Sequence, residues 1–175
     1  KNADGDAMGS VLACYHYLKN RGHHARVVSP NDYPEFLKWL PGSQDVLRFD
    51  LQNKQSKRVL NQAELIFLMD FNEMGRVGDD MQNTMATLDV TYVMIDHHQQ
   101  PSDVAKYLYS DTSICATAQM FYHFLEQMGD LDAITSDMAT CMYTGILTDT
   151  GSFRFPNTTP TTHRIVAELI EKGAD

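Results

Sequence analysis

The fold is best indicated by Thr91-Tyr92-Val93-Met94-Ile95-Asp96-His97-His98, in which three polar residues follow an apolar run. The run is rich in β-branched and aromatic residues, which suits a strand buried in a parallel sheet. A second apolar run, Leu65–Met69, is followed in the same way by Asp70. Ligands of open parallel sheets bind at the carboxyl ends of the strands. The two runs therefore predict a parallel sheet with a polar site at that edge.

Around these two runs, short apolar stretches alternate with helix-like segments, which is typical of an α/β domain with a mostly parallel sheet. Further strands are expected at Ala25–Ser29 and Lys106–Tyr109. Helices are expected at Met8–Asn20, Tyr33–Leu40, Met74–Thr84, Ser113–Met128 and Ala133–Leu147. A last helix should have Thr159 as its N-cap, Pro160 in its first position and Gly173 at its end. We predict a three-layer sandwich, with the sheet flanked by helices.

The composition is that of one globular domain spanning residues 1–175. Hydrophobic residues make up 43% of the chain and charged residues 21%, which excludes a disordered or fibrous protein. A transmembrane helix needs about 20 apolar residues, and the apolar runs here are much shorter, so we expect no membrane contact. We expect no signal peptide. Three cysteines without CxxC spacing indicate reduced core thiols in a cytoplasmic protein.

The formal net charge of −9 argues against a protein that embraces long duplex DNA, because such proteins carry a basic surface. It does not argue against phosphate substrates, since metal ligands can account for part of the acidity and bound cations would reverse the local field. Acidity that only keeps the protein soluble is the alternative.

Two more segments place polar residues beside apolar elements. In Asp4-Gly5-Asp6-Ala7 an extended loop would turn both aspartates to the same side. Thr148-Asp149-Thr150-Gly151 follows the apolar end of a predicted helix. Taken with the strand ends, these segments offer carboxylate and imidazole ligands, a mixture that suits Mn²⁺ or Mg²⁺ better than a metal bound by thiolates.

Each segment also has a structural interpretation. Asp4 could form an Asp-Gly turn and cap a helix. Asp70 could cap the helix that follows it, and Gly151 could end a helix as its C-cap. Arg76 and Arg154 are the best cationic candidates for a substrate phosphate.

In their order along the chain, these segments resemble the DHH phosphoesterase superfamily. Asp4-Gly5-Asp6-Ala7 matches its first motif, Asp70 the second, Asp96-His97-His98 the third and Thr148-Asp149-Thr150-Gly151 the fourth. The later string Gly151-Ser152-Phe153-Arg154-Phe155, followed by Asn157-Thr158-Thr159, is most similar to the branch of nanoRNases and 3′-phosphoadenosine-5′-phosphate phosphatases.

The resemblance implies a pair of divalent cations, with Mn²⁺ preferred and Mg²⁺ or Co²⁺ as alternatives. Asp70 would bridge both ions, and Asp4 would hold the first. Asp6, His97 and Asp149 would complete the second site. Two cations about 3.5–4 Å apart activate a water and clamp the phosphoryl oxygens, so direct attack by water is expected.

Two residues of the third motif would serve the reaction without completing the second metal site. His98 would contact the scissile phosphate or assist the leaving group. Asp96 would orient the histidines.

The chain also departs from the superfamily pattern. The histidine that precedes the first aspartate by four residues would lie before Lys1, as would the first strand of the sheet. The C-terminal substrate-binding domain, called DHHA1, would lie beyond Asp175. We therefore expect a fragment of a longer two-domain protein, with weak or no activity by itself.

The resemblance implies hydrolysis of short oligonucleotides from the 3′ end or of 3′-phosphoadenosine-5′-phosphate, with a small nucleotide or short single-stranded RNA or DNA as partner. Polyphosphate, pyrophosphate, cyclic dinucleotides and longer single-stranded DNA are alternative substrates. A non-catalytic nucleotide-sensing or nucleic-acid-binding module is the alternative of another class. The sequence leaves open whether the protein forms a homodimer.

Overall fold

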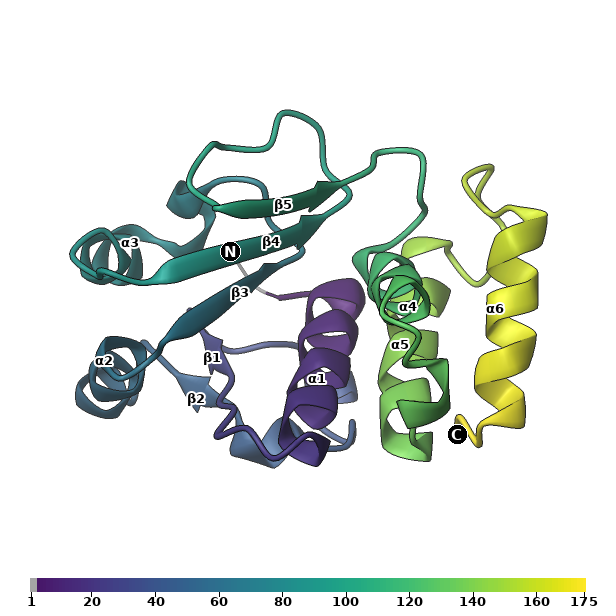
Figure 1. The fold of residues 1–175 in the computed structure, drawn as a ribbon, viewed down its shortest axis with the longest axis horizontal. Helices are drawn as coiled ribbons and strands as arrows, with labels where there is room; N and C mark the ends of the chain where they lie inside the picture. Colours follow the sequence, from purple (N-terminus) through teal and green to yellow (C-terminus); the bar gives the residue numbers. More distant parts are fainter. Residues whose placement is uncertain (1–2) are drawn as a thin grey trace.

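The computed structural model describes residues 3–175, in which six α-helices surround five short strands (Figure 1). The strands are β1 (Val28–Ser29), β2 (Leu47–Arg48), β3 (Leu65–Met69), β4 (Thr91–Asp96) and β5 (Tyr107–Ser110). The helices are α1 (Gly5–Asn20), α2 (Asn53–Asn61), α3 (Asp79–Met85), α4 (Thr117–Gln127), α5 (Ser136–Asp149) and α6 (Pro160–Glu171). Lys1 and Asn2 lie outside the described residues. Within residues 3–175, each helix is too short or too polar to cross a membrane.

All strand pairs are parallel, and they form two sheets, β1-β2 and β3-β4-β5. Leu65 of β3 lies opposite Thr91 of β4, and Met69 lies opposite Ile95. The arrowheads of β3, β4 and β5 consequently point the same way, towards the beginning of α4 (Figure 1). The predicted polar edge of a parallel sheet is therefore present.

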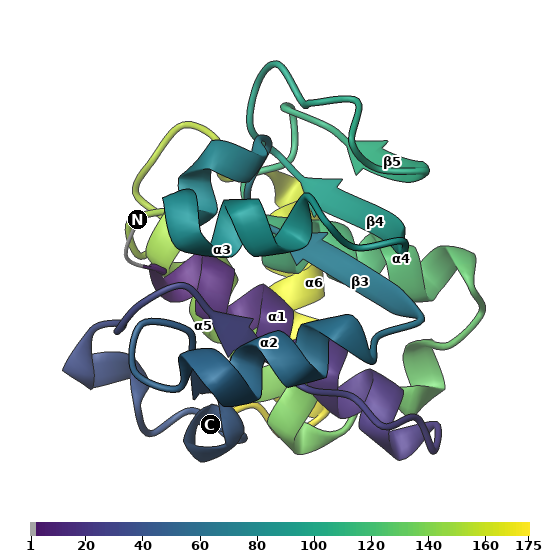
Figure 2. The same ribbon diagram turned by 90° about the vertical axis from the view of Figure 1, so that its left-hand side faces the viewer.

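Helices cover both faces of the sheets, which confirms the predicted three-layer sandwich. Helices α2 and α3 lie on one side, while α1, α4 and α5 lie on the other (Figures 1 and 2). Helix α6 packs on α5 and forms the outermost element of that side. The pleat of β4 divides its side chains between two cores: Tyr92 and Met94 pack with the helices α2 and α3, and Ile95 packs with α1, α4 and α5.

Glycines allow α1 and α5 to pack at very short distance. A Cβ atom on Gly9 would lie 2.4 Å from the Cys141 carbonyl oxygen. A Cβ on Gly145 would lie 2.6 Å from Ala118 Cβ and 2.9 Å from Asp6 Oδ1. Because no larger residue fits at these positions, α1 and α5 can approach until the beginning of one helix lies beside the end of the other.

A groove of about 960 Å³ separates β1 from β3. Residues 25–30 and 64–69 line it together with Met8 and Val11 of α1. Among the described residues, no strand pairs with β1 or β3 on the side that faces the groove. The strand expected before Lys1 stays a prediction, and this groove is the place that such a parallel strand would fill.

Several predicted elements were wrong in type or extent. The expected helix Tyr33–Leu40 is only a 3-10 turn, Glu35–Leu37, because Pro34 and Pro41 leave too short a segment for a helix. Gly78 divides the expected helix Met74–Thr84 into the 3-10 helix η3 (Met74–Val77) and α3, since its φ of +86° breaks the helical path.

The ends of other elements also differ from the prediction. Only Val28–Ser29 of the predicted strand Ala25–Ser29 pairs with a neighbour, and α4 begins at Thr117 instead of Ser113. The last helix was predicted correctly, with Thr159 as N-cap and a reciprocal hydrogen-bonded cap between Thr159 and Thr162.

Candidate metal centre

Four segments that are distant in the sequence meet beyond the carboxyl ends of β3 and β4. They are the beginning of α1, the residue that follows β3, the end of β4 with the two residues after it, and the end of α5. Together they contribute Asp4, Asp6, Asp70, Asp96, His97, His98 and Asp149. The fold thus brings the four predicted motifs to one place.

His97 lies at the middle of the cluster. Its Nε2 is 3.3 Å from Asp149 Oδ2, 3.6 Å from Asp70 Oδ1 and 3.7 Å from Asp6 Oδ2. Its Nδ1 lies 3.2 Å from the Ile114 carbonyl oxygen. A carbonyl oxygen can only accept, so Nδ1 carries the proton. In the neutral ring, the lone pair of Nε2 therefore faces three carboxylates, as in a metal-binding histidine.

Asp4 and Asp6 do not lie in an extended loop, and that prediction was wrong. Helix α1 already begins at Gly5, and Asp4 is its N-cap. Asp4 Oδ1 accepts the N–H groups of Asp6 at 3.1 Å and Ala7 at 3.0 Å, because unsatisfied donors at a helix start favour a carboxylate there. The structural interpretation of Asp4 as a helix cap is therefore confirmed. Its role as a metal ligand stays a prediction.

Asp6 projects from the first turn of α1 into the interior and is completely buried. Its Oδ2 accepts the N–H of Thr117 at 2.6 Å, and its Oδ1 accepts the N–H of Ala118 at 2.8 Å. Burial and the charge of Asp149 nevertheless raise the pKa of Asp6 to about 7. A cation beside Asp6 would remove this penalty on its charged form.

Asp70 directly follows β3 and has a φ of +61°, a conformation that is costly for a residue other than glycine. Its side chain is nearly buried, and its Oδ1 accepts a hydrogen bond of 3.0 Å from the Thr117 hydroxyl. Burial raises the pKa of Asp70 well above its usual value, and the charge of Asp6 raises it further. The N-caps of η3 and α3 are Glu73 and Gly78, so the alternative of Asp70 as a helix cap was wrong.

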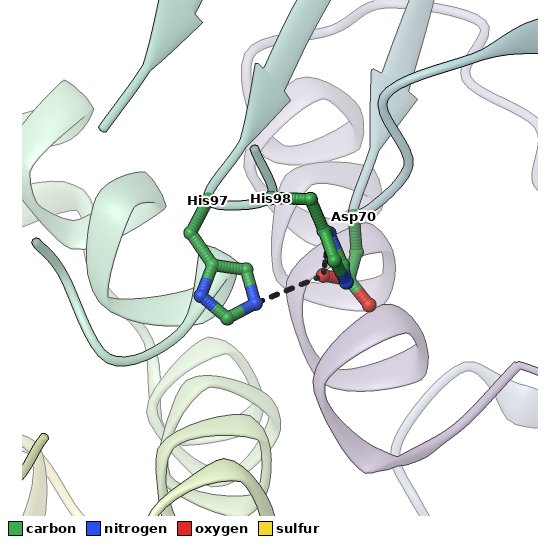
Figure 3. A group of neighbouring side chains, drawn as sticks. All are labelled: Asp70, His97 and His98. Carbon is green, nitrogen blue, oxygen red and sulfur yellow. Dashed lines mark ion pairs between the residues drawn. The ribbon is translucent and has the colours of Figure 1, made fainter. Parts of the chain in front are cut away.

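Asp96 fixes the orientation of His98. The Nδ1 of His98 donates to Asp96 Oδ1 at 2.7 Å, and the His98 backbone N–H donates to Asp96 Oδ2 at 3.1 Å. Asp96 is fully buried and orients His98 alone. The ring of His97 is oriented instead by the Ile114 carbonyl oxygen. Both rings are directed at Asp70 (Figure 3). The distance from His98 Nδ1 to Asp70 Oδ1 is 3.8 Å.

Asp149 is the last residue of α5, and the chain reverses directly after it. Gly151, Ser152 and Phe153 have φ values of 56°, 59° and 64°, so three consecutive residues adopt the left-handed conformation. The C-cap of α5 is Thr150, one residue before the Gly151 that was predicted to cap it, and Gly151 takes the left-handed position that follows the cap. The turn leads to Arg154, which is exposed and donates from Nε to the Gly151 carbonyl oxygen at 2.7 Å.

The remaining candidate, Arg76, is exposed on η3 in the segment after β3. The roles of Arg76 and Arg154 at a substrate phosphate stay predictions. Sequence reasoning did not identify Thr117, which contacts both Asp6 and Asp70. The sequence offered no local signal for Thr117, because both carboxylates that it contacts are distant along the chain.

The side chains form two groups that could hold a cation. One comprises Asp70, His97 and His98, and the other Asp6, His97 and Asp149. Within each group, one ligand atom per residue lies within 4.8 Å of the others. Octahedral ligands at about 2.1 Å from an ion lie about 3 Å apart in cis and about 4.2 Å apart in trans. The distances around His97 fit this range, and the oxygen and nitrogen donors suit Mn²⁺ or Mg²⁺.

The charges around His97 also favour a cation. Burial lowers the pKa of His97, but the hydrogen bond to Asp149 and the charge of Asp6 raise it more, so that the net pKa lies above the usual value. The acidic cluster thus attracts positive charge to this point. A divalent cation would supply that charge without a proton.

Comparison with known proteins gives a consistent result. The model of the DHH family, N-terminal domain, matches residues 1–146. The bifunctional oligoribonuclease and PAP phosphatase NrnA of Thermus thermophilus is 35% identical over 170 residues, covering 97% of this chain and 47% of that protein. The probable manganese-dependent inorganic pyrophosphatase of Streptococcus equi is 25% identical over 179 residues, covering 98% of this chain and 53% of that protein.

A solved structure agrees with these relatives. The exopolyphosphatase-related protein from Bacteroides fragilis is 36% identical and has a TM-score of 0.95, over 98% of this chain and 50% of that chain. The chain spans about half the length of each of these three proteins.

Proposed function

This chain belongs to the DHH family, because the model of that family's N-terminal domain matches its residues 1–146, and we propose that it is the metal-binding half of a phosphoesterase. Its substrates are short oligonucleotides and 3′-phosphoadenosine-5′-phosphate. A second, C-terminal domain of the same protein supplies further substrate contacts. The relative from Thermus thermophilus, whose name combines both activities, supports this choice of substrates.

The observation that carries the proposal is the position of His97 Nε2, which lies 3.3–3.7 Å from oxygens of three carboxylates. Like charges are placed so close together only where a cation compensates them or a proton neutralises them. His97, Asp6 and Asp149 would hold one divalent cation, and Asp70 with Asp4 would hold the other. Two such cations, when bound, would supply a nucleophilic water and stabilise the charge of the phosphoryl oxygens.

The cysteines support water as the nucleophile. Cys14, Cys115 and Cys141 are free and buried. Burial raises the pKa of Cys14 and Cys141 to about 12 and that of Cys115 to about 11. Their thiols therefore stay protonated at neutral pH, whereas nucleophilic catalysis requires the thiolate.

His98 is the group placed to act on the substrate. Its side chain is one-third exposed, whereas that of Asp96 is fully buried. Because Nδ1 donates to Asp96, the free Nε2 accepts a proton or donates one when the ring is charged. His98 therefore contacts the scissile phosphate or assists departure of the leaving oxygen, and Arg154 and Arg76 bind further phosphate oxygens.

Two observations favour pyrophosphate or polyphosphate as a second candidate substrate. The Streptococcus equi relative is named as a probable manganese-dependent inorganic pyrophosphatase, and the Bacteroides fragilis structure as exopolyphosphatase-related. The net charge of −9 disfavours long polyanions, because they would meet repulsion beyond the site. Short substrates are therefore preferred.

The test is product release by the intact protein with Mn²⁺ from an RNA dinucleotide, 3′-phosphoadenosine-5′-phosphate, pyrophosphate and polyphosphate. We expect release of mononucleotides from the dinucleotide and of phosphate from the bisphosphate, with both activities lost on chelation. Release from pyrophosphate alone would support the second candidate. Tight binding of metal and nucleotide without release from any substrate would refute the enzyme and support a sensing module.

A further inference from the structure

Thr117, the first residue of α4, contacts two of the expected metal ligands. Its backbone N–H donates to Asp6 Oδ2 at 2.6 Å, and its side-chain hydroxyl lies 3.0 Å from Asp70 Oδ1. The same two oxygens also lie near His97 Nε2, Asp70 Oδ1 at 3.6 Å and Asp6 Oδ2 at 3.7 Å. Thr117 is completely buried, so water does not compete for either contact.

The contact to Asp6 is rigid because it comes from a helix end. Helix α4 has Ala116 as its N-cap and no side chain of its own to satisfy the first N–H groups. The carboxylate of Asp6, from α1, takes that place by accepting from Thr117 and Ala118. The arrangement fixes both oxygens of Asp6 relative to α4.

The contact to Asp70 comes from the hydroxyl of the same residue. An ionised carboxylate can only accept, so the hydroxyl of Thr117 donates its single proton to Asp70. The β-branched side chain has few χ1 rotamers in a helix, and the hydroxyl of the observed one meets Asp70. One residue therefore sets the separation between a carboxylate of α1 and a carboxylate that follows β3.

We propose that Thr117 is a positioning residue that holds Asp6 and Asp70 at the separation required for a pair of divalent cations. The inference rests on the proposed metal centre. It adds that the spacing of the ligands depends on a hydroxyl that need not contact either cation. Groups that orient ligands in this way usually change metal affinity by about 10- to 100-fold when they are removed.

The test compares Thr117→Val, which keeps the shape and loses the hydroxyl, with Thr117→Ser, which keeps the hydroxyl and loses the methyl group. Mn²⁺ binding is measured by calorimetry, and coupling between two bound ions by electron paramagnetic resonance. We expect Thr117→Val to bind Mn²⁺ about 10- to 100-fold more weakly and to lose the spin-coupled signal. Thr117→Ser should retain both properties.

Thr144→Val is the matched control, because the buried Thr144 hydroxyl donates only to the Thr140 carbonyl oxygen within α5. It should bind Mn²⁺ like the unmodified protein. If Thr117→Val does not fold, Thr117→Ala against Thr117→Ser makes the same comparison, with Ala weak and Ser tight.

Wild-type affinity and spin coupling in folded Thr117→Val, or equal weakening in the Ser and Val variants, would overturn the role of the hydroxyl. Failure of the unmodified protein to bind Mn²⁺ would instead overturn the proposed metal centre.

Discussion

His97 Nε2 and Asp149 Oδ2 lie 3.3 Å apart, although one residue follows a strand of the sheet and the other ends a helix of the adjacent layer. The contact exists because α5 packs closely on α1 through glycines and ends where β4 ends. The candidate metal centre is thus built across two layers of the sandwich. Its geometry depends on the packing of helices as much as on the motifs themselves.

Asp149→Asn should separate metal binding from folding. The side chain is one-quarter exposed, and its charge raises the pKa of Asp6 and Asp70, so the metal-free protein loses repulsion when the charge is removed. We expect unchanged or higher thermal stability without metal, and a loss of about 100-fold or more in Mn²⁺ affinity and hydrolysis. Calorimetry and a melting curve without metal check both parts. Normal Mn²⁺ affinity would exclude Asp149 as a ligand.

Asp96→Asn should affect the reaction more than the metal. The carboxylate of Asp96 accepts from His98 Nδ1 and so determines which ring nitrogen faces outward. An asparagine can present its amide group to that nitrogen, and we expect kcat to fall by about 10- to 100-fold. Mn²⁺ stoichiometry should stay unchanged, as measured by calorimetry. Loss of bound Mn²⁺ together with kcat would show that Asp96 serves the metal instead.

Gly9→Ala should destabilise the whole domain, because the added Cβ would lie 2.4 Å from the Cys141 carbonyl oxygen. Separating α1 from α5 would cost about 1–3 kcal/mol or more. Urea denaturation measures this loss. Gly75→Ala is the control, since its Cβ would meet nothing closer than the end of the Glu73 side chain at 3.4 Å. Equal stability of the two variants would contradict the close packing.

The stability of the metal-free protein should fall as the pH rises through about 7. Burial, then the charge of Asp149, raises the pKa of Asp6 to about 7 from an ordinary 3.8. The folded state therefore binds the proton more tightly than the unfolded state. The resulting contribution to the free energy of unfolding is fully present below pH 3.8, the pKa of the unfolded state, and is lost as the pH rises through about 7, the pKa of the folded state.

Melting temperatures from about pH 5 to 8 without metal test this expectation. Asp6→Asn should show a smaller fall than the unmodified protein. Part of the fall should remain, because the pKa values of Asp70 and His97 are also raised and act in the same direction. The pKa of Asp130 is lowered by the hydrogen bond from Tyr17. Its contribution therefore makes stability rise with pH, but only at lower pH. Parallel curves for the two proteins would contradict the role of Asp6.

The sequence predicted best those parts that depend on neighbouring residues. Strand β3 was predicted with correct limits and β4 to within one residue, since each is a continuous apolar run followed by polar residues. The same feature identified Asp70 and Asp96-His97-His98. Helix α6 was predicted from its cap and its proline.

Features without a local signal in the sequence were not predicted. Helix α2 is strongly polar and buries only Ser56 and Leu60, so it lacks an apolar pattern that could reveal it. Thr117 was missed because its importance depends on Asp6 and Asp70, which only the folded chain brings to it. The helical position of Asp6 was missed because capping and an extended loop are equally compatible with Asp4-Gly5-Asp6.

The location of bound Mn²⁺ tests the account most directly. Crystals of the intact protein grown with Mn²⁺ should show two anomalous difference peaks about 3.5–4 Å apart, with the Asp70 carboxylate in contact with both. One peak should be bound by Asp6, His97 and Asp149. A single ion without contact to Asp70, or no peak among these side chains in an active protein, would contradict the two-cation centre.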